Sequence, residues 1–140
     1  MKWAALITWV LTAGGGFVLL AIWFARGGMR QGREPGARIR PALILSHFFL
    51  AATGLLIWII FLASDSDALA WIAFAILVVV ALLGFTMFAI WYQRRNQPAG
   101  SEQAPAAGAP AEQRFPVAIV GLHGLLAVTT VVLVFIAAIA

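Results

Sequence analysis

Four long runs of apolar residues dominate the sequence, and polar segments separate them. Each run has 23 to 25 residues and contains no Lys, Arg, Asp or Glu: about 3–25, 41–63, 68–92 and 116–140. A helix of about 20 residues spans the hydrocarbon core of a bilayer. The runs lack the period-two alternation of membrane strands. The pattern therefore predicts an all-α membrane protein, a four-transmembrane-helix bundle that forms a single membrane domain over residues 1–140.

The composition agrees with this class. The chain is 64% hydrophobic and 10% charged, with a mean hydropathy of +1.01, whereas soluble domains carry about 25% charged residues. The sequence has no cysteine, which excludes disulfides, thiolate metal sites and covalent c-type haem attachment. The first run follows Lys2 as in a signal peptide, but it continues to Ala25 and ends at a basic stretch, so we expect it to be a membrane helix.

Positive charges gather in two of the connecting segments. Segment 26–40 carries five arginines against one acid and segment 93–115 carries three against two, whereas segment 64–67 has two acids and no base. By the positive-inside rule, both arginine-rich segments are expected in the cytoplasm and both termini outside. The richness in Arg, Ala and Gly suits a GC-rich bacterium, so the predicted location is a bacterial cytoplasmic membrane. The net charge of +4 reflects this topology and predicts no nucleic-acid partner.

Tryptophans and a low-complexity segment extend this interpretation. Trp3 and Trp71 are expected at the outer membrane interface, and Trp23 and Trp91 at the inner one. Segment 96–113 is rich in Ala, Pro and Gly, which predicts a flexible cytoplasmic linker without a site.

An internal repeat relates the two halves of the chain. The stretch GFVLLAIWFAR (16–26) shares Gly, Phe, Ala, Ile, Trp and Arg, in order and without gaps, with GFTMFAIWYQR (84–94). HFFLAAT (47–53) shares His, Leu, Ala and Thr with HGLLAVT (123–129). These matches predict a tandem duplicated helical hairpin, with repeats at about 3–63 and 68–140. Equivalent helices run in the same direction, so the pseudo-two-fold axis is expected along the membrane normal.

The two histidines of the chain, His47 and His123, occupy equivalent positions in the repeats. His47 follows Arg40 by seven residues and His123 follows Pro116 by seven, which places both roughly 10 Å into the membrane from the cytoplasmic side. The axis puts them at one depth on opposite sides of the bundle. An ionisable residue inside the membrane is costly and indicates a function, and bundle cores hold cofactors with side chains from facing helices.

With two histidines on different helices at one depth, the chain resembles the membrane b-type cytochromes, in which a four-helix bundle holds haem non-covalently through two axial histidines. The resemblance is one of architecture and ligand placement, and it covers all four predicted helices. It implies one haem b ligated by His47 and His123, and single-electron transfer near the cytoplasmic face. Chlorophyll or another tetrapyrrole, with one histidine per metal ion, fits the same placement.

Small residues and arginines complete the predicted site. Room for the ring is expected at small residues on the histidine faces and on the neighbouring helices: Gly16, Gly84, Ala51, Gly54, Ala127 and Thr130. Four phenylalanines are expected at the ring edge: Phe17, Phe48, Phe49 and Phe85. Arginines at the cytoplasmic rim suit the propionates: Arg26, Arg38, Arg40, Arg94 and Arg114. We expect no catalytic residue, and the two histidines alone are too few ligands for zinc.

The predicted partners are those of an electron carrier in a bilayer. A quinone, a soluble redox protein or a larger respiratory complex would exchange electrons with it, and a homodimer stays open. The alternative is a structural or accessory subunit, or an assembly factor, without any cofactor, in which the histidines join helices by hydrogen bonds. A transporter or proton relay is disfavoured because the four runs contain no carboxylate.

Overall fold

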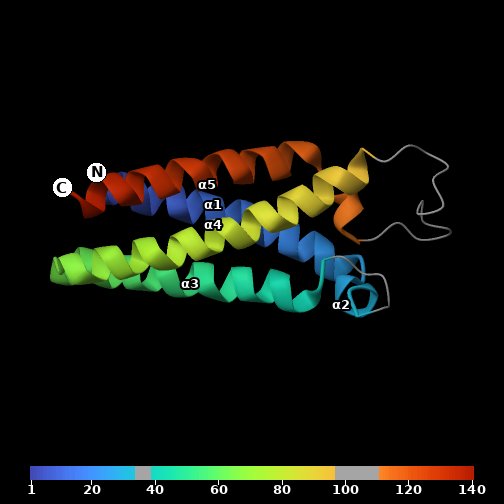
Figure 1. The fold of residues 1–140 in the computed structure, drawn as a ribbon, viewed down its shortest axis with the longest axis horizontal. Helices are drawn as coiled ribbons and strands as arrows, with labels where there is room; N and C mark the ends of the chain where they lie inside the picture. Colours follow the sequence, from blue (N-terminus) through green and yellow to red (C-terminus); the bar gives the residue numbers. More distant parts are fainter. Residues whose placement is uncertain (34–38, 97–110) are drawn as a thin grey trace.

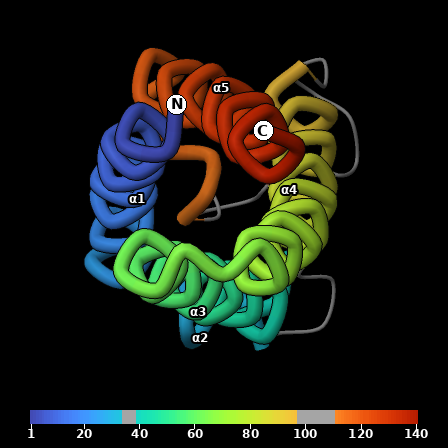
Figure 2. Tube along the Cα trace, turned by 90° about the vertical axis from the view of Figure 1, so that its left-hand side faces the viewer, coloured from blue at the N-terminus to red at the C-terminus, as the bar shows by residue number. Residues whose placement is uncertain are grey.

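The computed structural model describes residues 1–33, 39–96 and 111–140. Four long helices form a bundle: α1 (Lys2–Ala25), α3 (Pro41–Ser64), α4 (Asp67–Arg95) and α5 (Val117–Ala138). Around the bundle the order is α1, α5, α4, α3 (Figure 2), so α1 lies diagonally opposite α4, and α3 opposite α5. All four are long and apolar enough to cross a membrane. The prediction of an all-α four-helix bundle is confirmed.

The helix ends follow local chemistry and lie within three residues of the predicted ones. Pro41 is the first residue of α3, where its fixed φ and missing N–H are tolerated. Asp65 adopts a left-handed conformation with φ of 53° and ends α3. Helix α4 begins with Asp67 and ends with Arg94 and Arg95, charges that complement the helix dipole at each end.

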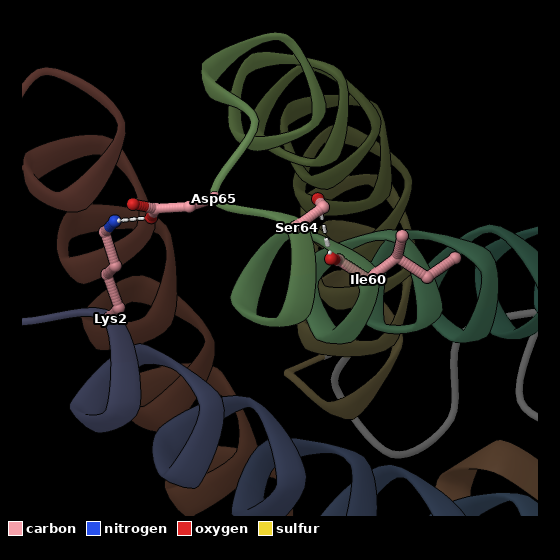
Figure 3. Close-up of polar contacts among 4 residues, drawn as sticks. All are labelled: Lys2, Ile60, Ser64 and Asp65. Atoms are coloured by element: carbon pink, nitrogen blue, oxygen red, sulfur yellow. Dashed lines mark hydrogen bonds and ion pairs between the residues drawn. The ribbon is translucent and has the colours of Figure 1, made fainter.

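Both chain termini lie at the end of the bundle where α3 turns into α4 (Figure 1). At this end Lys2 forms an ion pair with Asp65 (Figure 3). The Lys2 ammonium also lies 4.8 Å from the centre of the Phe61 ring, and Trp58 Nε1 donates to the Lys2 carbonyl at 3.4 Å. These contacts join the start of α1 to α3 and to the turn that follows it. Since both charged side chains are substantially exposed, the ion pair contributes little to stability.

The hydrophobic core occupies the half of the bundle near the termini. All four long helices contribute to it: Ala5, Trp9, Trp58, Phe61, Ala70, Ala73, Leu77, Val134 and Ala137. Its aromatic centre is compact, with ring centroids 6.4 Å apart for Trp9 and Trp58 and 4.8 Å apart for Trp58 and Phe61. This half is therefore closed by side-chain packing.

The outer surface of the long helices is apolar. Large hydrophobic side chains on every long helix are exposed, among them Ile7, Leu11, Phe49, Leu82 and Leu125. Such a continuous apolar surface would be unfavourable in water. With four helices of spanning length, it describes a multi-pass protein surrounded by a lipid bilayer.

The other half of the bundle is packed differently. Each long helix contains one long uninterrupted stretch in which no residue is buried. The four stretches are 10–22, 41–53, 81–90 and 117–129. We call these stretches together the open layer. In a close-packed bundle the inward positions would be buried, so the helices are less completely packed in the open layer than in the core.

A second set of buried residues closes the bundle beyond the open layer, at the end with the arginines. This end layer consists of Trp23, Gly28, Ile39, Trp91, Ala111 and Glu112. Two short elements contribute to it, α2 (Gly28–Gln31) and the 3₁₀ helix η1 (Ala111–Arg114). In Figure 2, η1 lies inside the ring of long helices. The open layer is thus bounded by the core on one side and by the end layer on the other.

Two sequence expectations are corrected at this end. Trp23 and Trp91 are only 1% and 5% exposed, so they pack inside the bundle and do not face lipid headgroups, whereas Trp3 and Trp71 are exposed. A Cβ at Gly28 would overlap the Trp23 indole, so the missing side chain of glycine lets α2 cover this ring.

The predicted linker 96–113 is wrong at its C-terminal end. Ala111 begins η1, and its backbone N–H donates to Gln31 Oε1 at 3.1 Å. This bond joins η1 to α2 across the end of the bundle. The remaining part of the predicted linker, 97–110, lies outside the described residues.

Gly54 provides a test of the core. A Cβ at this position would lie 3.1 Å from Trp9 Cζ2 and 3.2 Å from Ile76 Cγ2, so a side chain is confined between α1 and α4. We expect Gly54→Val to lower the free energy of unfolding by about 1–3 kcal/mol through overpacking, measured as a lower midpoint of thermal unfolding in detergent. The matched control is Gly121→Val, because a Cβ at Gly121 meets nothing within 4 Å. An equal shift for both variants would contradict the packing at Gly54.

Candidate histidine site

The structure brings His47 of α3 and His123 of α5 together across the bundle. Their ring centroids are 6.4 Å apart and their planes are inclined by 65°. Both side chains are partly buried, and both residues belong to the open layer. The two imidazoles therefore face one another from diagonally opposite helices.

Each imidazole is oriented by one backbone carbonyl. His47 Nδ1 lies 3.0 Å from the Val80 carbonyl oxygen, and His123 Nδ1 lies 2.9 Å from the Thr12 carbonyl oxygen. A carbonyl oxygen only accepts, so each Nδ1 carries a hydrogen and donates. Within the described part of the chain these are the hydrogen bonds that the two rings make. In the neutral ring, Nε2 then keeps a lone pair for a further ligand.

Two glycines allow the rings to approach the neighbouring helices. A Cβ at Gly16 would lie 3.1 Å from His123 Cε1, and a Cβ at Gly84 would lie 3.2 Å from His47 Cε1. These distances are tighter than ordinary van der Waals contact. Gly15 also faces His123, with a Cβ position 3.5 Å from that of the histidine. Glycine at 16 and 84 therefore sets how closely each imidazole lies against α1 or α4.

These contacts obey the symmetry of the repeat. The match of 84–94 to 16–26, extended back by four residues, pairs Val80 with Thr12. His47 of the first repeat therefore bonds to the Val80 carbonyl and packs against Gly84, both in the first helix of the second repeat. His123 of the second repeat makes the equivalent contacts with Thr12 and Gly16 in the first helix of the first repeat. The reciprocal arrangement agrees with a duplicated hairpin whose two copies contact one another through the histidines.

Two residues expected to give room for a ring have other contacts. Gly54 is buried against the Trp9 ring. The Thr130 side chain is 1% exposed, and its hydroxyl bonds to Thr12 Oγ1 at 3.1 Å and to the Leu126 carbonyl at 2.8 Å. Both lie seven residues beyond a histidine, two turns closer to the termini, where the bundle is closed. Ala51 and Ala127, one turn beyond the histidines, are partly buried in the open layer.

The expected phenylalanine contacts are wrong for most of the four residues. Phe17, Phe49 and Phe85 are 58%, 62% and 60% exposed, so they face outward from the bundle. Phe48 packs edge-to-face on Phe17 with centroids 5.3 Å apart. Phe17, Phe49 and Phe85 therefore belong to the outer apolar surface, whereas Phe48 is partly buried.

The predicted arginines gather at the end with α2 and η1. Arg26 follows α1, Arg40 precedes α3, Arg94 lies in the last turn of α4 and Arg114 ends η1. Arg94 is partly buried and the other three are exposed. Arg38 lies outside the described residues. The arginines therefore lie on the expected side of the histidine level, but the exposed ones are not enclosed with the imidazoles.

The pair offers two nitrogen ligands and no third protein ligand. Among the described residues, no group of three or more His, Cys, Asp or Glu side chains could hold a metal ion. A bare metal ion would thus be poorly held. Two opposed imidazoles suit a metal whose other ligands come from a non-protein group.

The sequence did not identify every residue that builds this site. The carbonyls of Thr12 and Val80 were missed because a backbone acceptor has no signature in residue identity. Trp91 was assigned to the membrane interface, yet its side chain is buried, and it follows Gly84 by seven residues, which in a helix places the two on nearly the same face. That spacing is the signal that could have shown that Trp91 faces inward.

Comparisons with models of protein families, with curated proteins and with solved structures find no match to this chain.

Proposed function

We propose that the chain is a membrane b-type cytochrome that holds one haem b between Nε2 of His47 and Nε2 of His123 and transfers single electrons. The observation that carries the proposal is the opposed imidazole pair, with centroids 6.4 Å apart. Two metal–nitrogen bonds of about 2 Å each, added to the radii of two imidazole rings, require a separation of similar size. The spacing of the pair therefore suits a shared metal.

The surroundings of the pair fit a flat macrocycle. No residue of the open layer is buried, and the glycines at 16 and 84 keep α1 and α4 free of side chains beside the rings. The donor set supports the same group, since a tetrapyrrole supplies the four further ligands that the described residues lack.

The residues around the pair would perform a defined task. The carbonyls of Val80 and Thr12 hold each Nδ1–H, which orients the ring and leaves Nε2 as the atom that would bind the metal. Haem, when bound, would supply one-electron redox chemistry. His47 and His123 would both be used in holding it, which favours electron transfer over oxygen binding or catalysis. A quinone or a soluble redox protein would exchange electrons at the arginine end, the nearer end of the bundle.

The test is the visible spectrum of the protein purified in detergent, recorded before and after dithionite. We expect a sharp Soret band and a sharp α band on reduction, the signature of low-spin bis-histidine haem b. A preparation that is colourless as purified, and that shows only the spectrum of free haem after haem is added, would refute the cytochrome.

A second candidate function draws on the hydrogen bonds of the histidines. His47 joins α3 to α4 through Val80, and His123 joins α5 to α1 through Thr12. In a haem-free accessory subunit these bonds would connect the hairpins. In that case His47→Ala would lower the thermal stability of a colourless protein, whereas added haem would leave both stability and spectrum unchanged.

The orientation in the membrane is a further part of the proposal. Both termini lie at one end and the described arginine-rich segments at the other (Figure 1), so the positive-inside rule places the termini outside. A reporter fused after Ala140 is expected to read as outside, and one inserted at Gly100 as cytoplasmic. A cytoplasmic signal from the C-terminal fusion would reverse the face at which electrons are exchanged.

A further inference from the structure

Trp91 presents a buried indole N–H without a partner. Its side chain is 5% exposed, and among the described residues its Nε1 is the buried side-chain polar atom for which no hydrogen bond is formed. Folded proteins pair nearly all such groups, and an exception indicates a role or a missing ligand. An acceptor from outside the chain would account for this donor.

The place of Trp91 indicates where that acceptor comes from. Trp91 follows Gly84 on α4 by seven residues, which is about 10 Å along the axis on nearly the same face. Gly84 faces the His47 ring, so the indole lies on the inner face, where the open layer meets the end layer. Its low exposure places the indole away from the lipid-facing surface. The acceptor that suits this donor is therefore one held between the helices.

The equivalent tryptophan of the first repeat is covered differently. Trp23 follows Gly16 by the same seven residues, but Gly28 of α2 lies directly against its indole, nearest to Cε2 and Nε1. Trp91 instead has the Arg95 guanidinium 5.7 Å from its ring centre. A positive charge beside an unpaired donor favours an anionic acceptor. The two repeats are thus alike at the histidines and unlike at these tryptophans.

We infer that Trp91 Nε1 donates a hydrogen bond to a propionate carboxylate of the haem held between His47 and His123; this inference rests on the proposed function. A haem at the histidines must direct its carboxylates away from the apolar core, towards the arginine end. Two helical turns separate Trp91 from the histidine level, comparable to the distance from the centre of a haem to its carboxylates. A buried neutral donor thereby joins the exposed arginines as a propionate contact.

The experiment compares haem b with its dimethyl ester, in which both carboxylates are blocked. The full chain, produced without haem in detergent, is titrated with each form, and the affinity is taken from the Soret band. We expect the wild type to bind haem b at least about tenfold more tightly than the ester, the effect of a hydrogen bond to a charged group. Trp91→Phe should weaken the binding of haem b about tenfold, which reduces this preference, and leave ester binding within about threefold of the wild type.

Two variants separate the hydrogen bond from packing. Trp23→Phe makes the same change in the other repeat and should keep the wild-type preference, whereas Trp91→Gln keeps an N–H donor and should restore part of it. Equal affinity of the wild type for haem b and for the ester would overturn the inference, even if no variant folds. An equal loss of affinity for haem b and for the ester in Trp91→Phe would also overturn it. If the wild type binds neither haem b nor the ester, the proposed function fails as well. If the wild type binds haem b and Trp91→Phe keeps the wild-type preference for haem b over the ester, only the inference about Trp91 fails.

Discussion

Replacement of His47 by alanine is expected to abolish the low-spin haem spectrum, and replacement of His123 should have the same effect. The two imidazoles oppose one another across the bundle, so each would be one ligand of the proposed haem, and neither has a substitute because the chain has two histidines in all. Loss of an outer-shell partner typically lowers metal affinity about 10–100-fold. Loss of the ligand itself should exceed that range, to more than about a hundredfold.

The measurement is a haem titration followed by the reduced visible spectrum, with Ser46→Ala as the matched control. Ser46 adjoins His47 in sequence, but its side chain is exposed and lies on a different face of α3. We expect Ser46→Ala to titrate like the wild type. If His47→Ala or His123→Ala keeps a low-spin spectrum, the two residues are not partners on one metal.

The loss of each histidine also removes a bond between helices, which must be measured separately. His47→Ala deletes the bond to the Val80 carbonyl, which keeps its own backbone bond within α4, and the loss of one such hydrogen bond typically lowers stability by about 0.5–1.5 kcal/mol. Thermal unfolding without haem measures this contribution alone. A cytochrome shows a further stabilisation when haem is added to the wild type, and the histidine variants should lack it.

The predictions that succeeded depend on long-range features of the sequence. Four uncharged runs of spanning length leave helices as the available structure, because the backbone must satisfy its own hydrogen bonds in lipid. The equal spacing of His47 and His123 from the ends of their runs placed them at one level, and the structure brings their rings together. The length of each apolar run and the position of each histidine within its run can be counted in the sequence, without knowing which residues of other helices lie beside them.

The predictions that failed concern which face of a helix is turned inward. In a soluble helix an apolar stripe marks the buried face, but here the lipid-facing side is equally apolar, so the stripe is absent. Phe17 and Gly16 are neighbours in one apolar run, yet Gly16 faces His123 and Phe17 is exposed. Gly54 was assigned to the ring because it shares a face with His47, whereas its neighbour is Trp9 of α1.

The layered packing explains why such errors cluster by depth. Trp9, Trp58 and Phe61 fill the half near the termini, so small residues there serve close packing. In the open layer, Gly16 and Gly84 face the imidazoles and let each ring lie close against a helix. Gly54 and Gly84 are thus the same residue type with different roles. They differ in the side chain that each one faces, which is Trp9 for Gly54 and His47 for Gly84.

Valine in place of Gly16 or Gly84 is expected to weaken haem binding about 10–100-fold, the range for residues that orient a metal ligand. A Cβ alone would lie 3.1 Å from His123 Cε1 or 3.2 Å from His47 Cε1, and the two methyl groups of valine need more room still. The ring must turn or move away, which breaks the geometry of its carbonyl bond. Because the contacts are equivalent in the two repeats, the variants should lose similar affinity.

Gly14→Val is the control for this prediction, since Gly14 lies two residues from Gly16 on the same helix and a Cβ there meets nothing within 4 Å. It should leave the Soret titration unchanged and show that valine itself is tolerated in α1. The glycine and histidine variants should also differ in kind. A displaced imidazole can still coordinate, so Gly84→Val should keep a low-spin spectrum at saturating haem, whereas His47→Ala should not regain one at any haem concentration. Wild-type affinity in Gly84→Val would mean that the His47 ring is not held against α4 when the metal is bound.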